Sequence, residues 1–236
     1  MNDISLIGLN PCAMLSIKNS EGAIQYVNLS GLSELQQKGL QLAKPINKGV
    51  IGMYVHSFGV NAYKVVNTGV NYAIILNDFL EIGVGLGFKN TSIQQYENRT
   101  KIQFSLAFNG RLSKKLTYGV VLNSLGKEQK SQQGVDPTIL YVGVNYKPSM
   151  HVSLISEIDK SLFSPLRWKF ACEYFATDYF ALRTGIIATT LQISGGVGIV
   201  VKKQIRFDLG TTWQPILGVG IHGGVIYSFK EKTWNE

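Results

Sequence analysis

The residues whose chemistry stands out are charged side chains in the second half of the chain, at alternate positions of strand-like segments. They are Arg167, Lys169, Glu173, Arg183, Arg206 and Asp208. Guanidinium, ammonium and carboxylate groups on one face can form charge-assisted hydrogen bonds to an anionic head group or to another segment of the same chain. The alternative is a hydrated wall of charged side chains that binds no ligand. We favour the hydrated wall and keep the ionic patch as a hypothesis.

Other titratable residues form no recognisable catalytic or metal-binding set. The histidines are His56, His151 and His222. They are far apart and lack the spacing of metal ligands. Glu157 and Asp159 share one face of a strand, but acid–base catalysis would also need a bound substrate and a shifted pKa. The Gly218–Gly223 stretch matches G-x-G-x-x-G without the following helix that a dinucleotide site needs. The sequence therefore predicts a non-enzymatic protein with no catalytic residues, cofactor or metal.

Strong alternation of apolar and polar residues shows which elements position these side chains. In Lys101–Leu112 the apolar residues fall on one face and the polar residues on the other. Such a period of two indicates a strand, and about 9–11 residues suffice for a tilted strand to cross a bilayer. Fourteen strands are predicted in all. Their ranges are 22–29, 37–46, 49–57, 62–76, 79–89, 100–112, 115–123, 138–147, 150–159, 165–176, 179–188, 191–201, 203–213 and 217–229.

Composition favours a membrane β-barrel over a soluble sandwich. Charged residues make up 16% of the 236 residues, below the roughly 25% of soluble domains, and apolar residues make up 45%. No apolar run approaches the roughly 20 residues of a membrane-spanning helix. The net charge of +8 comes from scattered Lys and Arg, which gives little support to nucleic-acid binding. A positive balance fits an anionic membrane surface, so outer-membrane lipid and lipopolysaccharide are the expected partners, with no nucleic acid.

The connections between the predicted strands alternate in length. Tight turns are expected at Asn47-Lys48, Asn77-Asp78, Ser113-Lys114, Pro148-Ser149, Thr177-Asp178 and Lys202-Lys203. The intervening connections are often longer, as in Lys89–Arg99 and Asn123–Asp136. Bacterial outer-membrane barrels have short periplasmic turns and longer extracellular loops. The pattern therefore predicts a Gram-negative outer-membrane location with both termini in the periplasm.

The last predicted strand carries a further signal. His222, Gly224, Tyr227 and Phe229 fit the C-terminal β-signal of outer-membrane proteins, in which a polar residue and a glycine precede two aromatic residues. That resemblance concerns insertion of a barrel and not transport. Lys230–Glu236 follow where many such proteins end on the aromatic residue. The other interpretation is ordinary strand alternation with aromatic residues near a membrane interface.

The order of these features resembles the FadL-like barrels, and within them the PorV/PorQ-like group of Bacteroidota-type bacteria. Asp3–Ala13 is similar to that group's early D…NPA segment, with Cys12 between Pro11 and Ala13. Gly69–Ala73 and Glu81–Gly87 are similar to its central hairpins. The resemblance implies a fourteen-stranded barrel with an N-terminal segment in the lumen. It also implies that a signal peptide is missing from this chain, and that the family's roles are passage of hydrophobic molecules or service in secretion machinery.

The predicted fold class is therefore all-β, a transmembrane antiparallel β-barrel of about 14 strands with an N-terminal plug. Residues 1–20 are the luminal plug segment, 21–230 the barrel and 231–236 a short periplasmic tail, with the Asn10-Pro11 turn packed against glycines of the wall. The expected function is an accessory subunit of an outer-membrane complex for secretion or assembly, with other outer-membrane proteins as partners. The alternative is a FadL-like transporter of hydrophobic small molecules, with Pro45 as a candidate defect for a lateral opening.

The two cysteines are not expected to form a disulfide. Cys12 lies outside the strand pattern, whereas Cys172 falls on the apolar face of a predicted strand. Two such cysteines do not make a disulfide framework. Cys172 is therefore expected to be a free thiol that faces lipid.

Overall fold

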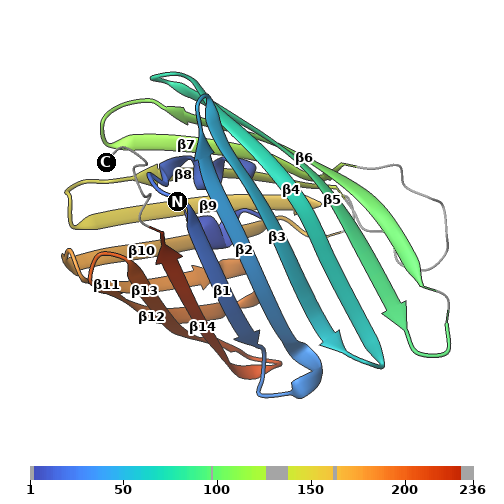
Figure 1. Ribbon diagram of the computed structural model, residues 1–236. Helices are drawn as coiled ribbons and strands as arrows, with labels where there is room; N and C mark the ends of the chain where they lie inside the picture. The colour runs from blue at the N-terminus through green and yellow to red at the C-terminus, as the bar shows by residue number, and fades with distance from the viewer. Residues whose placement is uncertain (1–2, 97, 126–137, 162–163, 230–236) are drawn as a thin grey trace.

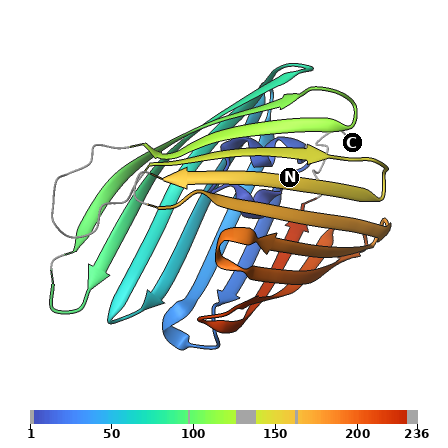
Figure 2. The same cartoon turned by 180° about the vertical axis from the view of Figure 1, so that it is seen from behind.

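The computed structural model describes residues 3–96, 98–125, 138–161 and 164–229. Within these ranges the chain forms one closed barrel of fourteen antiparallel strands (Figures 1 and 2). Each strand pairs with its neighbours in sequence, and β1 closes the ring by pairing with β14. The strands are β1 (Glu21–Asn28), β2 (Gln36–Ile46), β3 (Gly49–Val60), β4 (Tyr63–Asn77), β5 (Leu80–Ile93), β6 (Arg99–Arg111), β7 (Leu116–Leu125), β8 (Ile139–Tyr146), β9 (Val152–Ser161), β10 (Arg167–Thr177), β11 (Phe180–Ile187), β12 (Gln192–Val201), β13 (Ile205–Gln214) and β14 (Gly218–Ser228).

Every predicted strand is present, so the prediction of a fourteen-stranded all-β barrel is confirmed. The predicted long connection after Lys89 is shorter than expected, because β5 continues through polar residues to Ile93 and β6 begins at Arg99. Paired backbone groups, and not side-chain alternation, hold this extension in the sheet. The second expected long connection falls mostly in 126–137, and the expected tail is 231–236; both lie outside the described residues.

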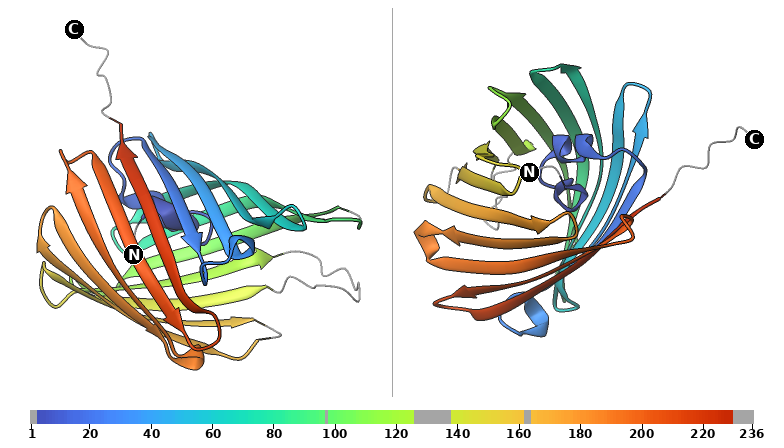
Figure 3. Two further views of the ribbon diagram at one scale, coloured as in Figure 1. Left: turned by 90° about the horizontal axis from the view of Figure 1, so that it is seen from below. Right: turned by 90° about the vertical axis from the view of Figure 1, so that its left-hand side faces the viewer.

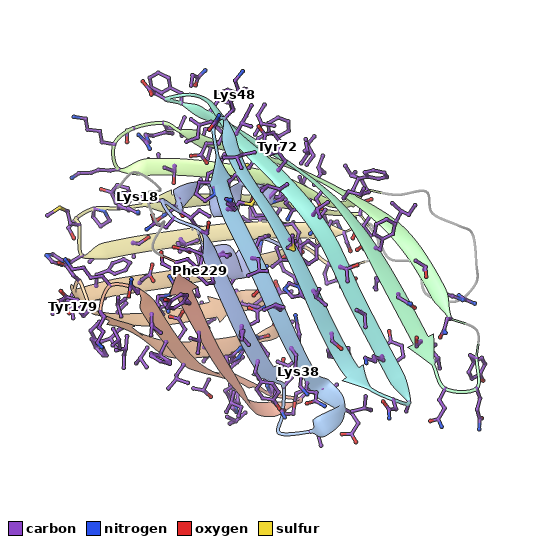
Figure 4. The ribbon with its side chains drawn as sticks, in the orientation of Figure 1. Lys18, Lys38, Lys48, Tyr72, Tyr179 and Phe229 are labelled. Carbon is purple, nitrogen blue, oxygen red and sulfur yellow. The ribbon has the colours of Figure 1, made fainter. Side chains whose placement is uncertain are left out.

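Strand alternation sends apolar side chains to the outside of the barrel. On β2, for example, Leu40 and Leu42 are exposed outside, whereas Gln41 and Ala43 are buried inside. Exposed aromatic side chains border this apolar surface near both ends of the strands, and Figure 4 labels three at the end that holds Glu21 and Ser228. They are Tyr72, Tyr179 and Phe229. An apolar outer band flanked by aromatic residues is the surface of a barrel that lies in a membrane.

The two ends of the barrel differ in their connections. At the end that holds Glu21 and Ser228, called here the turn end, hairpins such as β2–β3 and β4–β5 close with two residues. At the opposite end, called the loop end, the β1–β2 connection contains the short helix η3 (Ser33–Leu35), and η4 (Ala188–Thr190) joins β11 to β12. The β3–β4 connection at this end is an exception and has two residues. No helix in the described part of the chain is long and apolar enough to cross a membrane.

Pro45 does not interrupt the sheet. It pairs with Val50 of β3, and the pairing of β1 with β2 ends two residues earlier, at Ala43 opposite Glu21. Pro45 therefore lies beyond the end of the β1–β2 ladder, where a missing backbone N–H opens no gap between these strands. The expectation that this proline marks a defect in the wall is wrong.

Before β1, the chain folds into two short 3-10 helices, η1 (Ile4–Leu6) and η2 (Pro11–Ser16). Figure 3 shows them in blue within the ring of strands. Asp3 begins η1 and Asn10 begins η2, and each side-chain oxygen accepts a hydrogen bond from the backbone N–H two residues later. Pro11 suits the first position of a helix because it has no N–H to satisfy. The absence of strand alternation in 1–20 thus corresponds to helical turns.

Candidate functional site

The N-terminal segment, residues 3–17, packs against the inner surface of the wall formed by β1–β6, with η1 on β1 and β2 and η2 on β3–β6. Glycines of the wall allow this close approach. A Cβ atom added at Gly83 would lie 2.8 Å from Pro11 Cβ and 2.9 Å from Cys12 Sγ, and one at Gly52 would lie 2.5 Å from Ile7 Cδ1. Since real Cβ atoms do not approach other atoms so closely, side chains at these two positions would require the segment or the wall to shift. The Asn10-Pro11 turn lies at this contact.

Hydrogen bonds attach the same segment to the strands. The Asn71 side-chain amide donates to the backbone oxygen of Ile7 at 2.6 Å, and Asn123 donates to that of Leu9 at 3.4 Å. These asparagines lie on β4 and β7, so two separate strands of the wall hold the segment. Buried backbone carbonyls outside regular structure need such partners. The segment is therefore bound by polar contacts as well as by packing.

The apolar core of the molecule lies between this segment and the wall. Ile4, Ile7 and Met14 have at most 1% of their surface exposed, and they pack against small residues of β1–β4 and against Ile226. Tyr54 packs against the edge of this cluster. Most other large apolar side chains face outward, as expected for a membrane barrel. Burial of the N-terminal segment is thus the main source of apolar packing inside the barrel.

Cys12 is fully buried in this contact. Its Sγ lies 3.6 Å from the backbone oxygen of Ala107 on β6. Burial raises the pKa of the Cys12 thiol to about 12, with a further contribution from the charge of Glu81. A neutral thiol is a poor nucleophile and a poor metal ligand. In the packed segment, Cys12 is therefore an unreactive apolar side chain.

Two clusters of ion pairs line the opposite part of the lumen, on β9–β13. In the first, Lys169 Nζ lies 2.7 Å from Glu157 Oε1 and 2.8 Å from Asp159 Oδ1, and Arg167 Nη2 lies 2.7 Å from Asp159 Oδ2. All four residues come from the facing strands β9 and β10. The charges of the cluster sum to zero, two cations against two carboxylates.

The second cluster lies nearer the turn end and reaches the N-terminal segment. Arg183 pairs with Glu173 at 2.6 Å and with Asp208, and Arg206 pairs with Asp208 at 2.8 Å and with Asp3. Asp3 also caps η1, so this chain of ion pairs ends on the first turn of the segment. Each predicted cation of the charged patch thus has a carboxylate partner, and one of them contacts the N-terminal segment directly.

A polar cluster that the sequence reasoning did not identify lies beneath the segment. Gln41 Nε2 is 2.6 Å and Gln25 Nε2 is 3.3 Å from His56 Nε2, and Gly8 lies against the imidazole ring. The Tyr54 ring is 5.3 Å from the His56 ring. Apart from Gly8, these residues all occupy inward positions of β1–β3, so strand parity alone would have placed their side chains together. Because polar side chains are ordinary in a barrel lumen, nothing in the sequence singled them out.

The residues of the expected β-signal lie on β14 or just after it. His222 and Gly224 face inward, and His222 Nε2 is 2.6 Å from Thr212 Oγ1. Tyr227 and Phe229 face outward with their ring centroids 4.8 Å apart. The Phe229 N–H donates to the backbone oxygen of Ser20 at 2.8 Å, at the point where the barrel closes. Their role in insertion stays a prediction.

No metal-binding geometry is found in the described residues. Among them, no group of three His, Cys, Asp or Glu side chains could hold a metal ion. Cys12 and Cys172 are both free thiols and lie on opposite sides of the wall, the first in the lumen and the second on the outer surface. The residues described above therefore suit packing, ion pairing and lining of a lumen.

Comparison with known proteins identifies the fold. No family model matches the sequence, and no curated protein matches it. Among solved structures, the toluene transporter TbuX of Ralstonia pickettii superposes with a TM-score of 0.75 at 9% identity, over 97% of this chain and 94% of that one. The monoaromatic hydrocarbon channel CymD gives 0.73 at 10% identity, over 98% and 94% of the two chains. A FadL homologue of Pseudomonas aeruginosa gives 0.71 at 10% identity, over 97% and 95%.

The chain has the fold of these channels. Together with the apolar outer surface, this fold places the chain in the bacterial outer membrane, as the alternation of turns and loops predicted. The likeness is to a FadL-type barrel as a whole. The finer resemblance to the PorV/PorQ group stays a prediction.

Proposed function

We propose that this protein is a non-enzymatic channel for hydrophobic small molecules across the outer membrane, and that residues 3–17 form a plug in its lumen. The observation that carries the proposal is the fold shared with hydrocarbon channels over nearly the full length of both chains. It favours the transport alternative over an accessory subunit of a secretion complex. Monoaromatic hydrocarbons are the substrate class that these two structures suggest for a first test.

The packing of the N-terminal segment supports the plug. Ile7, Cys12 and Met14 are fully buried against the wall, and Asn71 and Asn123 hold the segment from two sides. A barrel of fourteen strands is wider than an eight-stranded one, whose side chains fill its interior. In the proposed plug, passage of a solute therefore requires the segment to shift.

A reversible covalent lock tests both parts of the proposal. In a Cys172→Ser background, Gly83→Cys places a second thiol beside Cys12, because a Cβ atom at residue 83 would lie 2.9 Å from Cys12 Sγ. Cys12 regains its reactivity when the segment detaches transiently, and oxidation through that state should join the segment to β5 after a small displacement. Gly83→Ser is the matched control, since it adds a side chain of similar size without a thiol.

The assay is the initial uptake of radiolabelled toluene by a Gram-negative host that lacks a FadL-type channel of its own. We expect the parent protein to raise uptake above that of the empty vector. Oxidised Gly83→Cys should return uptake to the vector level, and a reductant should restore it to the level of Gly83→Ser. Uptake at the vector level for a correctly folded parent barrel would refute the channel. Uptake that stays high in the oxidised, cross-linked protein would refute the plug alone.

A further inference from the structure

A polar hollow lies on the outer surface of the barrel, at the loop end of β2–β4. Its volume is about 510 Å³, and its lining includes Gln36, Lys38, Ser57, Gly59, Asn61 and Lys64. Figure 4 shows Lys38 beside the β1–β2 connection, at the end opposite to Lys48. The hollow is separate from the lumen, because the neighbouring residues Gly39, His56 and Val65 are the ones that point inward.

The backbone of β3 leaves the floor of this hollow empty. Gly59 pairs with Lys64, and its φ of +88° is a conformation that side chains other than hydrogen rarely allow. A Cβ atom there would also collide with the backbone oxygen of Tyr63. Ser57, which pairs with Lys38, contributes only a hydroxymethyl group. The outward positions of β3 between the two lysines therefore carry a small side chain, at Ser57, or none, at Gly59, which leaves a depression.

The two lysines of the hollow are available to bind an anion. Neither Lys38 nor Lys64 forms an ion pair with any residue in the described ranges, and both are exposed. By contrast, the luminal cations of the charged patch, Arg167, Lys169, Arg183 and Arg206, each have a carboxylate partner. Lys38 and Lys64 lie on strands two apart, about 10 Å across the sheet, so their long side chains can converge on one group between them.

The hollow also lies where the apolar outer surface ends. The next outward residues toward the turn end are Leu40 on β2 and Val55 on β3, and both are exposed. The residues Lys38 and Ser57 come directly after them toward the loop end. In a barrel whose termini are periplasmic, the loop end is in the outer leaflet, so this boundary is at the level of the lipid head groups.

We propose that this hollow binds the phosphorylated head group of a lipid A molecule in the outer leaflet. The Lys38 and Lys64 ammonium groups would donate charge-assisted hydrogen bonds to a phosphate, and the Ser57 hydroxyl and the Gln36 and Asn61 amides can donate to its remaining oxygens. The acyl chains of the same molecule would lie along the apolar surface that begins at Leu40 and Val55. A free phosphate would make no contact with that apolar surface, so we assign the site to a lipid.

The test measures lipid retention by the purified full-length barrel in detergent. Bisphosphorylated lipid A is added, and the fraction of protein that carries one lipid is measured by native mass spectrometry. The test variant is Lys38→Gln with Lys64→Gln. Lys44→Gln is the matched control, because Lys44 is also exposed on the outer face of β2 but lies toward the turn end. Heat-modifiability in electrophoresis verifies that each variant is folded.

We expect the parent and Lys44→Gln to retain lipid A equally. Each of the two substitutions in the hollow should weaken retention about tenfold, equivalent to about 1.4 kcal/mol. Removing the phosphates from lipid A should weaken its retention by the parent to the level of the double variant. Equal retention by the parent and the double variant, or of lipid A with and without phosphates, would overturn the proposal. Full competition by inorganic phosphate at an equal concentration would overturn the assignment to a lipid. None of these outcomes bears on toluene uptake, so the transport proposal stands or falls separately.

Discussion

Replacing Met14 with alanine should free the N-terminal segment from the barrel wall. Met14 is fully buried, and its Sδ lies where a side chain at Gly52 would be, on the inner face of β3. Truncation of a buried methionine to alanine costs about 2–5 kcal/mol. If the segment detaches as a unit, this cost falls on the equilibrium between the packed and the detached segment, because the barrel strands keep their own pairing.

The thiol of Cys12 reports this equilibrium. In the packed segment its pKa is about 12, so at pH 8 only about one thiol in ten thousand is the reactive thiolate. In the detached segment the thiol regains an ordinary pKa and is accessible to solvent. Labelling by a maleimide therefore proceeds through the detached state, and its rate follows the population of that state. A loss of about 3 kcal/mol corresponds to a labelling rate roughly 150-fold higher.

The assay uses the Cys172→Ser background, so that Cys12 is the single thiol, and follows maleimide incorporation by mass spectrometry. Met53→Ala is the control, because Met53 is next to Gly52 in sequence but faces outward with 54% of its surface exposed. It should label at the parental rate. The reasoning is refuted if Met14→Ala also labels at the parental rate, or if the parental Cys12 already labels as fast as in the unfolded protein.

Three further predictions concern other parts of the barrel. Arg206→Gln removes the ion pair to Asp3 and should raise single-channel conductance in planar bilayers. The conductance should approach that of a variant lacking residues 1–20. An unchanged conductance in both variants would mean that the segment does not close the lumen. Cys172, which lines an apolar groove on the outer surface, should react with a lipid-soluble maleimide and resist a membrane-impermeant one, and equal labelling would contradict its lipid-facing position. Pro45→Ala should leave toluene uptake unchanged, and a marked decrease would restore a role for this proline in a lateral opening.

Alternation determined most of the fold because a membrane barrel places one face of every strand in lipid. In β6, Ile102 and Phe104 face outward and Gln103 and Ser105 face inward, as the period of two requires. The ends of strands are less predictable. Beyond Phe88 the outward positions of β5 become polar, so the pattern disappears although the pairing of β5 with β4 continues to Ile93.

Contacts across the lumen could be predicted only in part. Strand parity predicts that Arg206 and Asp208 share the inner face, where the structure places both, but it does not show which charges meet. The pair of Arg206 with Asp3 joins residues 203 positions apart, and it depends on where η1 lies. The contact of Cys12 with Gly83 has the same origin. Such pairings follow from the three-dimensional course of the segment, which has no periodic pattern to reveal it.

The pairing of β1 with β14 has a consequence for the order of assembly. It joins the first strand to the last, so it carries the largest loop-closure entropy of all the strand pairings and is expected to form late. The N-terminal segment is attached to β1 at this seam, and most of its contacts are with β1–β6, which pair with one another without β14. Ile226 of β14 and Arg206 of β13 add the remaining contacts when the seam closes. We therefore expect the segment to settle on its half of the wall while the sheet is still open, and closure of the seam then encloses it. The N-terminal segment is in this view a part of the insertion pathway, present in the lumen from the moment that the lumen exists.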